Sequence, residues 1–103
     1  MAVKHIILWT LKKEGRTEAE IAAIKDGIKK GLEGLSGKIP GLLSIRVQTV
    51  GLPSSTADVM LDSVFSDAEA LRGYAVHPAH TAVANEKVRP FTATRACLDF
   101  EEE

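Results

Sequence analysis

The alternation of apolar and polar positions predicts four strands of two kinds. Residues 3–11 carry apolar side chains at both odd and even positions, which is typical of a central strand covered on both faces. Residues 42–50 instead alternate between apolar and polar side chains, so this strand has one drier face and is expected near a sheet edge. Two further strands are expected at about residues 57–65 and 92–100.

The first helix is predicted between the first two strands. Thr17 and Glu20 have the capping-box spacing, in which two side chains satisfy unpaired amides at a helix start. Isoleucine and leucine then recur at three- and four-residue intervals, so one apolar stripe runs until Ser36 and Gly37 end the helix.

The second helical region is interrupted by a proline. Ser66 and Glu69 repeat the capping-box spacing and predict a short helix that ends near Tyr74. Proline suits the first position of a helix, whereas the residue before a proline is pushed out of helical geometry. We therefore expect His77 at a boundary and a new helix from Pro78 to about residue 90.

This order of elements, β-α-β-β-α-β, predicts an α+β ferredoxin-like sandwich in which one sheet lies under its helices. With 103 residues, 45% hydrophobic and 26% charged, the chain suits a single domain over residues 1–103. A chain of this size buries only about two-thirds of its unfolded surface, so a partner subunit would add to the core. We expect a homodimer, formed through the sheet face that carries Lys4, Ile6 and Leu8.

Charge and composition exclude several classes of partner. The net charge is -1 and the basic residues are scattered, which argues against nucleic acid and anionic membranes as partners. The glycines form no phosphate-binding loop, so no cofactor is expected. The lone cysteine, Cys97, excludes an internal disulfide and is interpreted as a packing residue, and no apolar run reaches the about 18 residues of a membrane span. A cytoplasmic location is the expectation.

The richest chemistry lies between Tyr74 and His80, a segment that holds a phenol and two imidazoles. His80 falls in the first turn of the helix that Pro78 opens, where the positive end of the helix dipole favours the neutral ring that a general base needs. His80 and Tyr74 are therefore the candidate catalytic residues. Phenol and imidazole together suit the handling of a carbonyl oxygen and a nearby proton.

Strand parity adds candidate ligand-binding residues. His5, Ile7 and Trp9 share one side of the first strand, and they would line the same space as His80 if that side meets the helices. With His77, the third histidine, they give a mostly apolar pocket with a few convergent polar groups, as small-molecule sites have.

Two other interpretations of the histidines stay open. They could cap a helix and satisfy backbone groups without any chemical role. Three histidines could also bind zinc, although the spacing of His77 and His80 lacks the glutamate of the H-E-x-x-H arrangement. We expect no metal.

The sequence resembles the stress-responsive α/β-barrel family, often called Dabb domains. The resemblance rests on residues 1–8, 65–71 and 98–100, and above all on the Tyr74-x-x-His77-Pro78-x-His80 segment combined with the N-terminal Lys-His strand. It implies a dimeric ferredoxin-like fold in which two sheets pack face to face into a barrel. In a plant polyketide cyclase of this family, the positions matching His80 and Tyr74 are catalytic, which implies the same roles here.

Two classes of function follow. In the first, the protein binds a small, largely apolar carbonyl compound and acts on it by acid–base chemistry. In the second, it is a non-catalytic dimeric stress-response or structural protein whose histidine turn only fastens the helices to the sheet. An open cavity beside His80 would favour the first, and a cavity filled by Trp9 and Phe65 would favour the second.

Overall fold

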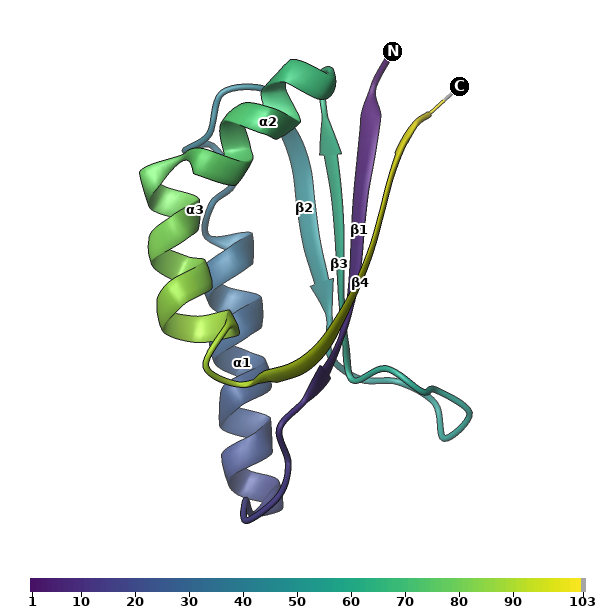
Figure 1. The fold of residues 1–103 in the computed structure, drawn as a ribbon, viewed down its shortest axis with the longest axis vertical. Helices are drawn as coiled ribbons and strands as arrows, with labels where there is room; N and C mark the ends of the chain where they lie inside the picture. Colours follow the sequence, from purple (N-terminus) through teal and green to yellow (C-terminus); the bar gives the residue numbers. More distant parts are fainter. Residues whose placement is uncertain (103) are drawn as a thin grey trace.

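The structure, a computed structural model that describes residues 1–102, is a four-stranded antiparallel sheet with its helices on one face (Figure 1). The strands are β1 (Val3–Leu11), β2 (Leu42–Gln48), β3 (Val59–Phe65) and β4 (Thr92–Glu101). Their order in the sheet is β2-β3-β1-β4, so β1 is central and β2 lies at an edge. The predicted α+β ferredoxin-like fold is confirmed.

The first helix, α1 (Glu18–Glu33), begins as its capping box predicts. The Thr17 hydroxyl accepts a hydrogen bond from the Glu20 amide at 3.1 Å, and the Glu20 carboxylate accepts one from the Thr17 amide at 2.9 Å. The helix ends at Gly34, slightly before the predicted Ser36 and Gly37. Its stripe is buried at Ile28 and Leu32.

The second helical region consists of α2 (Ala68–Val76), α3 (Pro78–Val83) and the wider π-helical turn η1 (Ala84–Val88). The predicted break is confirmed: His77 is extended and Pro78 opens α3. The predicted cap of α2 was wrong by one residue, because the Asp67 carboxylate, rather than Ser66, accepts from the amide of Ala70 at 2.8 Å. An aspartate at this position competes well with serine, since it caps as strongly and its charge favours the helix start.

The connection between β2 and β3 is longer than predicted. The two strands stop at Gln48 and start at Val59, not at Val50 and Ala57. The ten residues between them form a loop that projects beyond the sheet (Figure 1). Pro53 inside it has no backbone N–H and cannot extend the hydrogen-bonded ladder.

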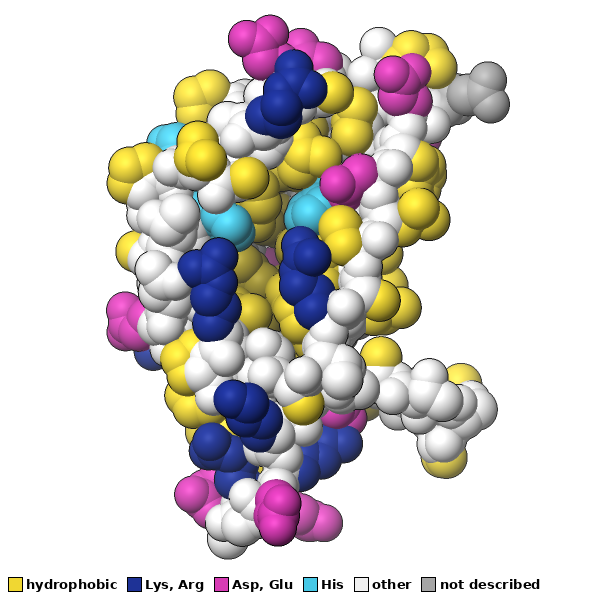
Figure 2. Space-filling view, viewed as in Figure 1, with side chains coloured by type: hydrophobic (Ala, Val, Ile, Leu, Met, Phe, Trp, Pro, Cys, Tyr) yellow, Lys and Arg dark blue, Asp and Glu magenta, His cyan; other side chains and the backbone are white. Residues whose placement is uncertain are grey.

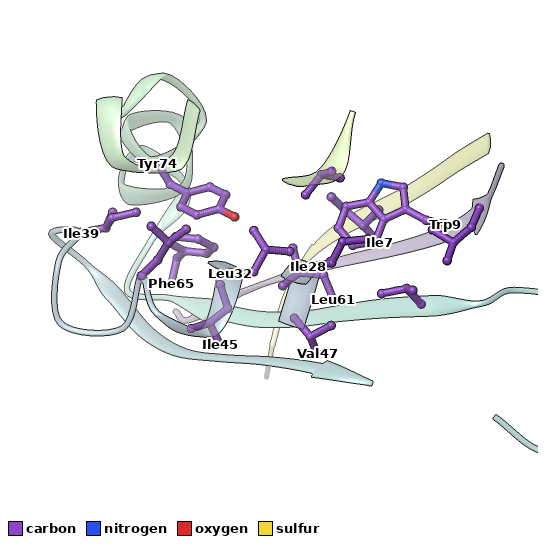
Figure 3. Packing of buried hydrophobic residues seen from close by; sticks show 14 residues of the cluster. Ile7, Trp9, Ile28, Leu32, Ile39, Ile45, Val47, Leu61, Phe65 and Tyr74 are labelled. Atoms are coloured by element: carbon purple, nitrogen blue, oxygen red, sulfur yellow. The ribbon is translucent and has the colours of Figure 1, made fainter. Parts of the chain in front are cut away.

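The core lies between the sheet and α1, with α2 closing one end (Figure 3). Its most deeply buried residues come from every layer: Ile28, Leu32, Val47, Leu61, Phe65 and Tyr74. Gly31 allows the helices to approach closely, because a Cβ at this position would lie 2.9 Å from the Val83 side chain. Close contact between α1 and α3 fixes where the second helical region stands over the sheet.

The opposite face of the sheet carries apolar side chains with no helix over them. Leu8 pairs with Ala96 and Ile6 pairs with Leu98, so even-numbered residues of β1 and β4 share this face. Leu8 is 42% exposed and Leu98 is 65% exposed. Within residues 1–102, no helix is both long and apolar enough to cross a membrane.

Candidate functional site

A cavity of about 480 Å³ lies between the sheet and the second helical region. Its floor is β1, one wall is α2 with α3 and η1, and the other wall is the edge strand β4. Figure 2 shows this hollow from its open side, with histidine side chains facing it and apolar side chains beneath. The cavity has the size of an ordinary small-molecule site.

The floor is formed by the side chains that strand parity predicted. His5, Ile7 and Trp9 all point to the helix side of β1, and each is about 95% buried. Trp9 lines this space without filling it, and Phe65 packs in the core against Tyr74 and does not line the cavity, so the cavity stays open beside His80.

Tyr74 and His80 stand together on the helix wall. Their ring centroids are 4.1 Å apart, with 34° between the ring planes, and the Tyr74 ring also packs 4.9 Å from Phe65. His5 lies across from them, with its ring centroid 6.0 Å from that of Tyr74. In Figure 3 the Tyr74 hydroxyl points away from α2, toward the space beside Leu32 and Ile7.

Two buried polar atoms of this pair have no hydrogen-bond partner in the described part of the chain: the Tyr74 hydroxyl and Nδ1 of His80. Leaving a buried polar group unpaired costs about 1–3 kcal/mol, and most proteins avoid that cost. Both residues line the cavity. A ligand with a polar group would offset the cost.

Burial sets the protonation states of the pair. It raises the pKa of Tyr74 far above its ordinary value, so the phenol stays protonated and can donate a hydrogen bond. Burial also lowers the pKa of His80, and the positive charges of Arg89 and Arg95 lower it further, against the backbone of Ala75, which raises it. The predicted neutral imidazole therefore has burial as its main cause rather than the dipole of the short helix α3.

His5 is held by two residues of β4. Nδ1 of His5 pairs with Asp99, which lies directly opposite in the sheet register. The Cys97 sulfur lies 3.7 Å from the same nitrogen and 3.5 Å from Oδ1 of Asp99. The donor atoms of these three residues lie within 4.8 Å of one another, which makes them the group able to hold a metal ion in residues 1–102.

The expectation that all three imidazoles meet at one site is wrong for His77. Its Nδ1 accepts a hydrogen bond from the Ala79 amide at 3.1 Å and so caps α3. It borders a different depression, beside Pro40 and Gly73. The physical reason is Pro78, which fixes His77 at the helix boundary with its ring turned onto the backbone. This geometry also removes the three-histidine zinc arrangement.

The structure adds residues that the sequence interpretation missed. Cys97 is exposed and borders the cavity, so its assignment as a core residue was wrong. Arg95 and Asp99 line the cavity from the same face of β4, and Arg89 lines it from the end of η1. The spacing of positions 95, 97 and 99 does predict that the three side chains share one face of the strand. Placing that face at the cavity required the register between β4 and β1, which one sequence does not supply.

Comparisons with solved structures agree with the fold. A dimeric protein of unknown function from Bacteroides fragilis with a ferredoxin-like fold is 30% identical, with a TM-score of 0.88 over 98% of this chain and 96% of that one. A hydroxynitrile lyase from Passiflora edulis is 16% identical, with a TM-score of 0.71 over 96% of this chain and 91% of that one. SnoaB, a cofactor-independent oxygenase from Streptomyces nogalater, is 16% identical, with a TM-score of 0.66 over 99% and 93%.

Sequence comparison gives the family. No protein with curated annotation matches the chain. The profile of the stress responsive A/B barrel domain, Dabb, matches residues 3–102, which is nearly the whole sequence. A Dabb family protein of known structure is described as having a ferredoxin-like fold, which agrees with the architecture of this chain. The chain belongs to the stress-responsive A/B barrel domain family.

Proposed function

We propose that the protein binds a small, largely apolar carbonyl compound in this cavity and acts on it by acid–base chemistry. The observation that carries the proposal is the pair of unpartnered polar atoms, the Tyr74 hydroxyl and His80 Nδ1, on side chains that line an open apolar cavity. A purely structural turn would be expected to satisfy these atoms within the protein.

The chemistry follows from the two protonation states. Neutral His80 accepts a proton from the carbon next to the substrate carbonyl, and the electron pair of that C–H bond moves onto the carbonyl oxygen as an enolate forms. Tyr74 donates its hydrogen bond to this oxygen, where the negative charge develops. Ile7 and Trp9 hold the apolar body of the substrate and exclude water.

His5 acts as a positioning group on the opposite side of the cavity. Its contact with Asp99 fixes the orientation of the ring, as a carboxylate partner commonly does for histidine. The distant relatives support chemistry on this fold, since one is described as a hydroxynitrile lyase and another as a cofactor-independent oxygenase. Neither description identifies the substrate of this chain.

The active form that we propose is a homodimer. The relative from Bacteroides fragilis is described as dimeric, and the bare sheet face of this chain combines exposed apolar side chains with Arg46 and one ion pair, Lys4 with Asp62 at 2.8 Å. Such a face is self-complementary across a two-fold axis. The cavity opens on the other side of the sheet and stays accessible in that dimer.

Proton abstraction can be tested with 2-acetylnaphthalene, an apolar ketone with exchangeable methyl protons. We expect the protein to accelerate exchange of these protons for deuterium in D₂O, measured by NMR. His80→Ala should lose about 10²- to 10⁴-fold of that acceleration, because general-base catalysis supplies about that factor. The thermal midpoint should not fall.

The matched control is His77→Asn. It removes the other histidine of the same turn, which lies outside the cavity, and keeps an N-cap side chain for α3. This variant should exchange protons like the unchanged protein. If His80→Ala instead lowers the thermal midpoint and leaves ketone binding and exchange unaltered, the histidine is structural and the proposed function is wrong.

A further inference from the structure

Arginine side chains gather at the cavity although the protein as a whole is slightly acidic. Arg72, Arg89 and Arg95 line it, and among residues 1–102 the one carboxylate in its lining is that of Asp99, which is paired with His5. The whole chain has a net charge of -1. The cavity therefore concentrates positive charge that the rest of the surface does not show.

Within residues 1–102, these arginines have no acidic partner, whereas five of the eight lysines do. Five lysines form ion pairs with aspartate or glutamate: Lys4, Lys13, Lys29, Lys30 and Lys87. None of the ion pairs among residues 1–102 involves an arginine that lines the cavity. The guanidinium of Arg89 donates a hydrogen bond to the neutral side chain of Asn85.

Two of the arginines stand on opposite walls. Arg95 projects from β4 and Arg89 follows η1 on the helix side, and Figure 2 shows basic side chains on both sides of the hollow, next to the histidines. Their positive charge acts on His80 and Tyr74: both arginines lower the pKa of His80, and Arg95 opposes the rise that burial causes in the pKa of Tyr74. A guanidinium group presents a planar fork of N–H donors that matches the two oxygens of a carboxylate.

The rest of the cavity determines the shape of a ligand that would use this charge. Below the arginines the lining is apolar, with Ile7, Trp9 and Leu61 among its members. A fully charged molecule would leave this surface unused, and a fully apolar one would leave two cations without a counter-charge. The arrangement fits a molecule with an apolar body and one anionic end.

We propose that the ligand of this cavity is an amphipathic carboxylate, with an aromatic or short alkyl body on the β1 floor and its carboxylate held between Arg89 and Arg95. This inference rests on the proposed function, since it concerns the same cavity, and it adds the charge class of the substrate. The carbonyl that His80 and Tyr74 address then belongs to the same molecule as the carboxylate.

The experiment compares two probes of equal shape, 2-naphthoate and its neutral amide, 2-naphthamide, by calorimetric titration at low ionic strength. We expect the carboxylate to bind about tenfold more tightly, because charge-assisted hydrogen bonds exceed neutral ones by about that factor even at a partly exposed site. Arg89→Gln and Arg95→Gln should each abolish most of this preference while leaving amide binding unchanged. Lys38→Gln, which removes an exposed cation in the turn after α1 that does not line the cavity, is the matched control and should keep it.

The outcomes separate the two proposals. Equal binding of both probes, with loss of binding in Tyr74→Phe, would overturn the carboxylate inference and leave the cavity as a site for neutral compounds. A preference for the carboxylate that survives both arginine substitutions would also overturn it. If neither probe binds, both the carboxylate inference and the proposed function are wrong. A preference that both substitutions remove supports the inference.

Discussion

The two halves of the helical layer cover the same sheet in different ways. Over β2 and β3, the single helix α1 closes the core, with Ile28 and Val47 fully buried. Over β1 and β4, the second helical region leaves a cavity of about 480 Å³, and Cys97 on the inward face of β4 remains exposed. The half under α1 is a packed core, the closed half, and the half under α2, α3 and η1 surrounds the cavity, the open half.

The difference originates in the sequence of the two helical regions. The first has one uninterrupted apolar stripe over the 16 residues of α1. The second is broken at Pro78 and passes from α3 into the wider turn η1, so it cannot lay a continuous stripe on the sheet. The broken helical region packs less completely against the sheet, and it places the rings of Tyr74 and His80 side by side. Loss of packing beside unpaired polar groups is typical of a site that is kept for a ligand.

The largest expected effect contrasts core substitutions in the two halves. Ile28→Ala should lower the free energy of unfolding by about 2–5 kcal/mol, because it opens a cavity in a fully packed region. Leu71→Ala, which removes a partly buried leucine that already borders the open cavity, should cost clearly less. Urea denaturation measures both. Equal losses would mean that the two halves are packed equally well.

The next effect concerns the face that neither half covers. Leu98→Asp should convert the proposed dimer to a folded monomer in light scattering at micromolar concentration, because the interface would bury an unpaired charge. Val76→Asp changes a residue of similar exposure on α2, on the helix side, and should leave the mass unchanged. A monomeric unchanged protein would contradict assembly through the sheet.

A smaller effect is a pH dependence confined to the open half. Burial lowers the pKa of folded His80 below its ordinary value of 6.5, which the unfolded chain retains. As the pH falls below 6.5, the unfolded chain therefore takes up a proton that the folded protein resists, so stability is complete above that value and declines below it.

Thermal denaturation across this range tests the effect. His80→Gln should decline less steeply than the unchanged protein between neutral and mildly acidic pH, because it has no imidazole at this position to titrate. The difference between the two curves isolates His80 from the other histidines. Parallel curves would show that this imidazole is not buried in its neutral form.

The sequence predicted the closed half better than the open one. Hydrophobic periodicity and the capping box placed α1 because both are local signals, and strand parity correctly put His5, Ile7 and Trp9 on the helix side. The proline rule placed the break at His77 for the same reason.

The errors lie where distant segments meet. His77 was expected in the cavity and instead caps α3, because its ring turns toward the backbone amide of Ala79 and accepts a hydrogen bond from it. Cys97 was expected in the core, and the importance of Asp99 and Arg95 was missed, since their roles follow from the register of an edge strand against β1. The alternation of residues predicts which face of β4 a side chain points to, but it does not reveal that β4 is an edge strand whose side chains are left uncovered.

The central claim, that the open half keeps polar groups unpaired for a ligand, is tested most directly by the free energy of unfolding of Tyr74→Phe. A buried tyrosine hydroxyl that is hydrogen-bonded within the protein normally contributes about 0.5–1.5 kcal/mol, which its removal would cost. Since the Tyr74 hydroxyl has no partner in residues 1–102, we predict that Tyr74→Phe is as stable as the unchanged protein or slightly more stable. A loss of about 1 kcal/mol or more would show that the hydroxyl is bonded within the folded protein, and would contradict the account.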